Sequence, residues 1–227
     1  MSFPVIPSTF IPCAILYGIL HLRFRLPKER GCAAVSLCHH VCAFFLGLYV
    51  HWKYAGSIAE HASFGPNHEY ELAVVLQHFN IGYFLYDFCH VVTWDRKFLL
   101  HHTVALLGYG TSEYANVFAL ANAVNTWITE GGSLMYSTYL VFKSPVTYKV
   151  FVGLYTLTRV YFAYWSLTVF RQVWRVLFEP GAAEARAMPA WAPYCALTLQ
   201  LVLLAVNIHF VTSHWLKLMK RGSKRSD

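Results

Sequence analysis

Long apolar segments, separated by short connections, dominate this chain. Most of them can cross about 30 Å of hydrocarbon as an α-helix, which takes about 17 to 25 residues, and the fourth is the shortest. The segments cover residues 6–22, 33–52, 72–93, 98–111, 116–142, 150–177 and 194–216. We therefore predict an all-α, polytopic membrane protein with about seven transmembrane helices.

The composition supports a membrane domain and leaves no room for a separate soluble one. Hydrophobic residues make up 57% of the chain and charged residues 13%, with a mean hydropathy of +0.42. Soluble domains are rarely so apolar. We expect an N-terminal transmembrane helix with a basic cytosolic loop (1–30), a transmembrane domain (31–216) and a basic cytosolic tail (217–227).

The basic residues predict the orientation of the chain. Lys and Arg in short loops are retained on the cytosolic side, and most of the 18 in this chain fall there if the N-terminus is lumenal and the C-terminus cytosolic. The net charge of +7 therefore indicates anionic lipid headgroups as partners, and no nucleic acid. The oligomeric state is not predicted.

The adjacent pair His101 and His102 lies within an apolar segment, which suggests a polar site inside the membrane. An ionisable side chain at bilayer depth costs about 2.5 to 3.5 kcal/mol, so it usually faces the interior of a helix bundle. At a rise of about 1.5 Å per residue, both histidines and Asp87 come about 7 to 9 Å inside the predicted cytosolic border. Adjacent helical residues point about 100° apart, so we expect one histidine to face the cavity and the other a neighbouring helix.

A second polar layer is predicted closer to the middle of the membrane. Glu130, Arg159 and Asn207 come about 14 to 18 Å inside the border, and His39 about 10 Å. We predict that Glu130 pairs with Arg159, because each charge alone would cost several kcal/mol at that depth. These four residues are the candidate polar lining of a lipid cavity.

Clusters of cysteine and histidine raise the possibility of a metal site. In the run Cys38-His39-His40-Val41-Cys42, both cysteines lie on one helical face, and thiolate and imidazole both bind zinc. The spacing matches no closed zinc site, so small residues packing beside a polar cavity are the favoured interpretation. The histidine spacings of membrane di-iron oxidases are also absent. We therefore predict no metal site.

Two other classes of membrane protein are disfavoured. Asp95-Arg96-Lys97 lies at the cytosolic end of a predicted helix, as in heptahelical receptors, but the last span holds no Asn-Pro-x-x-Tyr. Intramembrane carboxylates also occur in transporters, but the chain has no inverted halves and few Gly or Pro breaks within its spans.

The order of these polar residues resembles that of the TLC-domain membrane proteins, which include the ceramide synthases and several lipid-homeostasis proteins of the endoplasmic reticulum. The resemblance covers about residues 30–217, and it implies six core spans around a cavity, here preceded by one extra helix. It rests on Cys38-His39, Gly82 to Asp87, His101-His102, Thr129-Glu130-Gly131-Gly132-Ser133, Arg159, Gln200 and Asn207.

In the ceramide synthases, a histidine pair that matches His101 and His102 supports acyl transfer from acyl-CoA to a sphingoid amine. An imidazole can deprotonate the amine or carry the acyl group, and a carboxylate such as Asp87 can orient it. The Asp-rich run that follows in that subfamily has no match here, because Glu130 is the one acidic residue between residues 116 and 139.

Two functions therefore remain. The first is a lipid-homeostasis protein that binds a lipid or acyl chain in a cavity lined by His101 and His102. The alternative is a His-dependent acyltransferase with acyl-CoA as co-substrate, in which His101, His102 and Asp87 are the catalytic residues. No other cofactor is expected, and the family resemblance and the basic tail indicate the endoplasmic reticulum.

Overall fold

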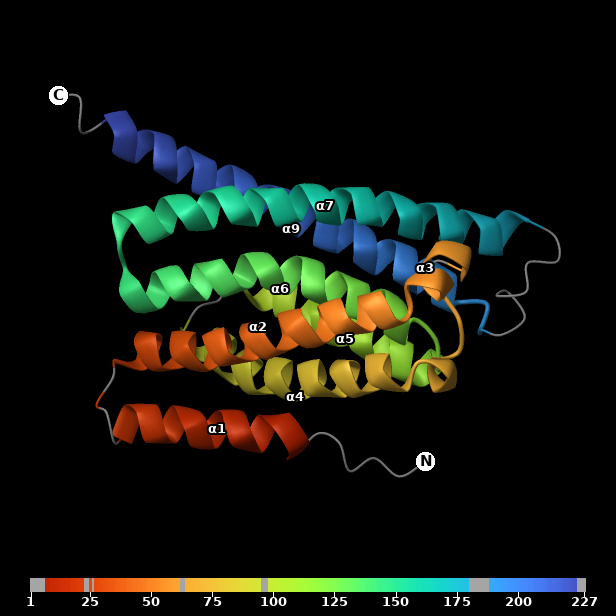
Figure 1. The fold of residues 1–227 in the computed structure, drawn as a ribbon, viewed down its shortest axis with the longest axis horizontal. Coiled ribbons are helices and arrows are strands. Elements are labelled where there is room, and N and C mark those ends of the chain that lie inside the picture. Colours follow the sequence, from red (N-terminus) through yellow and green to blue (C-terminus); the bar gives the residue numbers. More distant parts are fainter. Residues whose placement is uncertain are drawn as a thin grey trace.

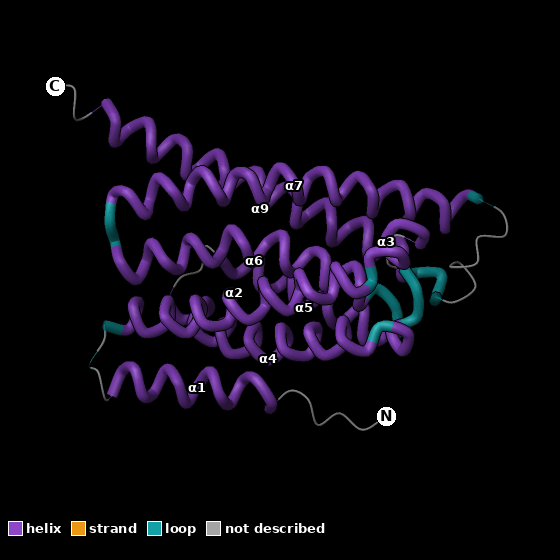
Figure 2. Tube along the Cα trace, in the orientation of Figure 1, coloured by secondary structure: helices purple, strands orange, loops and turns teal. Residues whose placement is uncertain are grey.

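A computed structural model describes residues 7–22, 25, 27–61, 64–94, 98–179 and 188–223 of the chain. Every regular element in this part is helical, which confirms the predicted all-α class (Figure 1, Figure 2). The elements are α1 (Pro7–Leu22), α2 (Lys28–Lys53), α3 (Ala55–His61), η1 (Asn67–Glu69), α4 (Glu71–Trp94), α5 (Leu99–Ala115), α6 (Ala119–Phe142), α7 (Pro145–Phe178) and α9 (Ala192–Ser223).

Each apolar segment of the sequence lies mostly within one of the long helices, but the helix count differs from the prediction. The described residues form eight α-helices, because the short α3 follows α2 where no helix was predicted. Within these residues, α2 (Arg30–Lys53) and α9 (Ala192–Lys220) are long and apolar enough to cross a membrane, and α1 has a shorter apolar stretch, Ile11–Leu22. Helix length and hydropathy therefore support membrane association but do not confirm seven spans.

The long helices run side by side, and six of them form a closed ring. Around the ring, α2 contacts α4, α4 contacts α5, α5 contacts α9, α9 contacts α7, α7 contacts α6, and α6 contacts α2. Helix α6 also contacts α4 and α5, so it leans toward the centre of the ring. Helix α1 lies outside the ring against α4 and α2 (Figure 1).

The turn between α6 and α7 marks one end of the bundle, which we call the α6–α7 end. The start of α2 and the end of α9 lie at the same end, whereas α3 and the end of α7 lie at the opposite one (Figure 1). Several basic residues gather here, since Lys28 begins α2, Lys143 follows α6, and Lys217 and Lys220 lie in the last turns of α9.

Local sequence explains why α6 and α7 reverse direction so tightly. Lys143 ends α6 in the left-handed conformation, with φ of 48°. The Ser144 side chain then accepts hydrogen bonds from the backbone N–H groups of Val146 and Thr147, and Pro145 occupies the first turn of α7, where its missing N–H is harmless. Because the connection is so short, the two helices stay antiparallel neighbours over their length.

Glycines let α6 approach its neighbours closely near the centre of the ring. A Cβ on Gly47 of α2 would lie 2.9 Å from the Cβ of Trp127. A Cβ on Gly132 of α6 would lie 2.5 Å from the Thr158 hydroxyl and 3.2 Å from Nη1 of Arg159. The close contacts fix the position of α6 between α2 and α7, and therefore of the Glu130 side chain.

The α5–α6 turn at the opposite end is held by a buried asparagine. Asn67 donates from its side chain to the Ser112 carbonyl at 3.1 Å and accepts from the Ala119 N–H at 2.9 Å. Asn116 and Phe118 both adopt positive φ in this turn, with φ of 55° and 76°. Such a conformation is unfavourable for Phe118, and the bonds to Asn67 help to stabilise it.

Candidate functional site

A cavity of about 420 Å³ lies inside the ring, in the half near the α6–α7 end. All six ring helices contribute to its lining, and each presents side chains three or four residues apart, so that one face of each helix points inward. The charged and imidazole side chains of the lining are His40, Asp87, His90, His101, His102, Glu130, Lys143, Arg159 and His214.

His102 is held in a fixed orientation by two hydrogen bonds. Its Nδ1 donates to the Phe98 carbonyl at 2.9 Å, and its Nε2 lies 2.6 Å from Oδ2 of Asp87. Since the carbonyl can only accept, Nδ1 carries a hydrogen, and one proton is shared between Nε2 and the Asp87 carboxylate. The arrangement fixes both the ring plane and its protonation pattern.

His101 also lines the cavity, but it is held less firmly. Its Nδ1 is buried without a hydrogen-bond partner, and its ring lies edge-on to His102 with 5.5 Å between centroids. His102, bonded to Asp87 of α4, faces a neighbouring helix, as predicted for one of the two histidines, but it also lines the cavity beside His101.

A second histidine–carboxylate pair lies deeper in the cavity. Nδ1 of His40 contacts Oε2 of Glu130, and these side chains are 12% and 6% exposed. As in the first pair, an imidazole nitrogen and a carboxylate oxygen form a hydrogen bond. His39 rather than His40 was selected from the sequence. The polar residue Ser36, one helical turn before His40 and on the same inward face, was a signal for His40.

The predicted ion pair between Glu130 and Arg159 is absent. Arg159 lines the cavity, but its Nη1 donates to the Thr129 carbonyl at 2.9 Å, and its guanidinium lies over the Tyr155 ring at 4.1 Å. The Thr129 carbonyl and the face of the Tyr155 ring bind the Arg159 guanidinium, and the Glu130 carboxylate pairs with His40 instead. Both residues line the cavity, but counting depth from the sequence could not fix the directions of their side chains.

The other two predicted cavity residues lie outside the lining. His39 is 3% exposed and stacks on the Tyr83 ring at 3.6 Å, and both of its ring nitrogens lack hydrogen-bond partners. Asn207 of α9 is 2% exposed, and its Nδ2 has no partner. Both are buried between helices rather than on the cavity surface.

These groups give the cavity the means for proton transfer and for anion binding. Two histidines share protons with carboxylates, and His101 offers a ring nitrogen without a competing bond. Arg159 adds a positive charge near the deep end. Such a set can bind a polar headgroup, or hold and release a proton near a reacting atom.

Comparison with protein families gives one result, and it matches the geometry. The family model of the TLC domain matches residues 32–216, which include every ring helix except the first turn of α2 and the last turns of α9. Comparisons with curated proteins and with solved structures give no significant match. The chain belongs to the TLC-domain family.

Proposed function

We propose that this chain is a polytopic membrane protein of lipid homeostasis, which binds a lipid or an acyl chain in the cavity of its six-helix ring. The observation that carries the proposal is the cavity itself. Its volume of about 420 Å³ falls in the range of about 300 to 1,000 Å³ that is typical of small-molecule sites.

The distribution of side chains supports a lipid environment around the ring. Large apolar residues are exposed along one face of α7, where Val150, Leu154, Leu157, Tyr161 and Tyr164 are all more than 40% exposed. In a soluble protein, a continuous apolar stripe of this kind would be an interaction surface or a liability. In a bilayer, it is the surface that contacts acyl chains.

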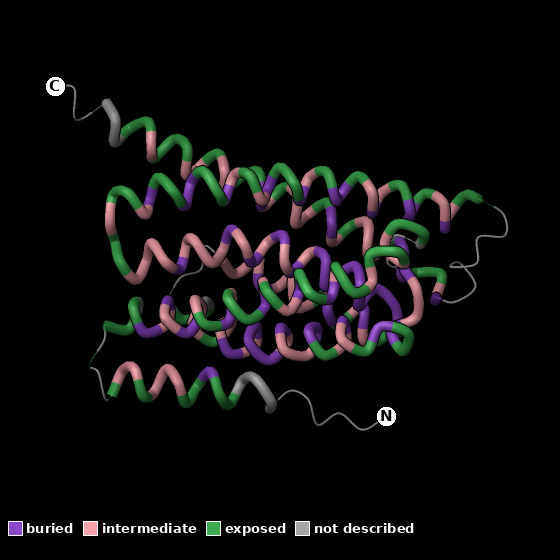
Figure 3. Tube along the Cα trace, viewed as in Figure 1, coloured by how far each residue is buried: buried purple, intermediate pink, exposed green. Residues whose placement is uncertain are grey.

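The interior shows the complementary pattern. Glu130, Arg159, Asn80 and Gln77 are each at most 6% exposed, and buried residues concentrate where α2, α4, α5 and α6 meet (Figure 3). Polar groups inside and apolar groups outside are the arrangement expected when intramembrane charges face a cavity. Together with the basic α6–α7 end, this supports a cytosolic opening and a lumenal N-terminus, and the family supports the endoplasmic reticulum.

The cavity lining suggests how a lipid would be held. Phe98, Leu140, Phe151 and Phe210 provide an apolar surface for an acyl chain. The histidine–carboxylate pairs and Arg159 provide donors and charge for an ester, an amide or a phosphate. The ligand's polar end would then lie among the histidines, with its chain against the aromatic rings.

Acyl transfer is the second candidate function, and the free ring nitrogen of His101 favours it. In this reaction, the amine or hydroxyl of an acceptor lipid attacks the thioester carbon of acyl-CoA while His101 takes the proton from the attacking atom. The carbon–sulfur bond then breaks, and the CoA thiolate leaves with the proton from His101. His102, fixed by Asp87, would orient the acyl carbonyl.

Photolabelling tests lipid binding in the cavity, which both functions require. A photoactivatable fatty acid or lipid is supplied to microsomes that contain the wild-type chain, Ser133→Phe or Thr198→Phe. Ser133 lines the cavity whereas Thr198 lies exposed on α9, so the first variant should lose labelling and the second should keep it. Equal labelling of all three, at equal expression, would contradict binding in the cavity.

The same microsomes test the transferase. Labelled acyl-CoA is supplied with sphingoid and lysophospholipid acceptors, and wild type is compared with the double variant His101→Ala/His102→Ala and with His78→Ala. His78 pairs with Glu113 at 2.8 Å, outside the cavity lining. A product that disappears only in the double variant would establish the enzyme, whereas lipid labelling without any product would leave binding as the function.

A further inference from the structure

We propose that His39, His40 and Glu130, at the deep end of the cavity, form a binding site for a divalent transition metal. Zinc is the metal that best matches these ligands. One ligand atom from each of these side chains lies within 4.8 Å of the other two. No metal site was predicted from the sequence, because the cysteines beside His39 were considered as ligands rather than Glu130, which lies 90 residues after His40.

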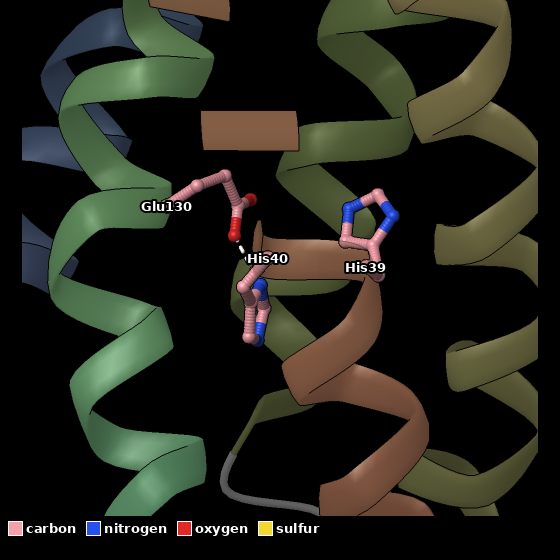
Figure 4. A group of neighbouring side chains, drawn as sticks. All are labelled: His39, His40 and Glu130. Carbon is pink, nitrogen blue, oxygen red and sulfur yellow. Dashed lines mark hydrogen bonds and ion pairs between the residues drawn. The ribbon is translucent and has the colours of Figure 1, made fainter. Parts of the chain in front are cut away.

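The strongest argument is the state of His39. The residue is 3% exposed, and neither of its ring nitrogens has a hydrogen-bond partner. A buried polar group without a partner costs about 1 to 3 kcal/mol. Figure 4 shows one nitrogen of the His39 ring turned toward the Glu130 carboxylate, so a cation between them would give that nitrogen a ligand bond.

The neighbouring residues hold this ring in place. His39 stacks between Tyr83, with ring centroids 3.6 Å apart, and Phe79, with centroids 5.0 Å apart. Such a stack restricts the plane of the imidazole and therefore the direction of its nitrogens. A preorganised ligand loses little freedom when a metal binds.

The donor set matches the preferences of zinc. Two imidazoles and one carboxylate are the protein ligands of several catalytic zinc sites, in which water or substrate takes the fourth position. Tetrahedral ligands about 2.0 Å from the ion lie about 3.3 Å apart, so separations of up to 4.8 Å have to shorten by at most about 1.5 Å. His40 lies on α2 and Glu130 on α6, so small rotations of these two side chains can bring the ligand atoms closer together.

The cysteines of the same segment point elsewhere. Cys38 and Cys42 are both exposed on the outer side of α2, whereas His39 is buried. The ligand atoms of His39, His40 and Glu130 are therefore nitrogen and oxygen, without sulfur. This excludes a closed site of the zinc-finger type at this position.

A metal ion at this site would take part in binding a ligand in the cavity. His40 and Glu130 both line the cavity, so the open coordination position faces it. The ion carries two positive charges and its ligands a single negative one, so an anionic fourth ligand is expected. Hydroxide or an oxygen of a lipid headgroup would serve, and the ion would polarise a bound carbonyl or phosphoryl oxygen.

Metal content tests the proposal directly and without any lipid substrate. The full chain is purified in mild detergent, treated with a chelator, dialysed against Zn²⁺ and analysed by mass spectrometry for bound metal. We expect one zinc per wild-type chain, and loss of that zinc in His39→Gln and in Glu130→Gln. His78→Gln and the double variant Cys38→Ser/Cys42→Ser should keep it, since none of these residues belongs to the set.

Two results would overturn the proposal: a wild-type chain that binds no zinc, or a His39→Gln chain that binds as much as wild type. If the variants do not fold, Co²⁺ in the wild-type chain gives an independent answer, because thiolate and imidazole ligands differ in their absorption spectra. A thiolate-to-cobalt band would show a site on the cysteines and refute this one. Because the zinc-binding experiment uses the metal alone, a negative result would leave the proposed lipid binding intact.

Discussion

Replacing Asp87 tests the view that a single shared proton holds His102 in place. In Asp87→Asn, the amide N–H can donate to Nε2 of His102, while Nδ1 still donates to the Phe98 carbonyl. In Asp87→Leu, the size is kept but Nε2 loses its partner. We expect the Leu variant to lose about 1 to 3 kcal/mol of stability and the Asn variant to lose less.

Thermal unfolding of the purified chain in detergent measures this difference. A change of 1 kcal/mol shifts Tm by about 2 to 4 °C in a chain of this size, so Asp87→Leu should lower Tm by about 2 to 12 °C. Adding His102→Phe to Asp87→Leu removes the unpaired nitrogen and should recover part of the loss. Equal Tm values for Asp87→Asn and Asp87→Leu would refute the reasoning, because the hydrogen bond would then contribute nothing.

Two further substitutions test the packing and the turn. Gly132→Ala places a methyl group 2.5 Å from the Thr158 hydroxyl and should cost about 1 to 3 kcal/mol by overpacking, whereas Gly153→Ala, with nothing within 4 Å, should be neutral or stabilising; equal Tm values would contradict this. Asn67→Leu removes the bonds to the Ala119 N–H and to the Ser112 carbonyl and should cost about 1 to 3 kcal/mol; a Tm equal to that of wild type in the same thermal assay would contradict this.

The sequence predicted the long helices, because each apolar segment lies mostly within one of them, although the segment 98–111 is shorter than a membrane span needs. The ends were less certain, and α5 extends to Ala115 where the apolar segment ends at residue 111. Polar residues such as Ser112 and Glu113 continue that helix, since they bond to Asn67 and His78 across the bundle. Local hydropathy does not contain this tertiary information.

The residues that line the cavity were predicted in part, because the sequence gives the position of a residue along a helix but not the direction of its side chain. Depth along a helix can be counted from the sequence, and it placed Asp87, His101 and His102 in one layer and Glu130 in a second, deeper one; all four line the same cavity. The direction of a side chain around the helix cannot be counted where no face is clearly apolar. His39 was therefore chosen in place of His40, and Glu130 was paired with Arg159 rather than with His40.

Four of the six helices that line the cavity do not meet a simple test for a membrane span. Helices α2 and α9 meet a simple test of length and hydropathy, whereas α4, α5, α6 and α7 do not. Asp87 lies on α4 and Glu130 on α6, and both face the cavity. Under the proposed membrane arrangement, a helix that brings charge into a cavity must become more polar on average. That α4 and α6 do not meet this test is therefore consistent with the polar residues they bring to the cavity, and it does not argue against their crossing the bilayer.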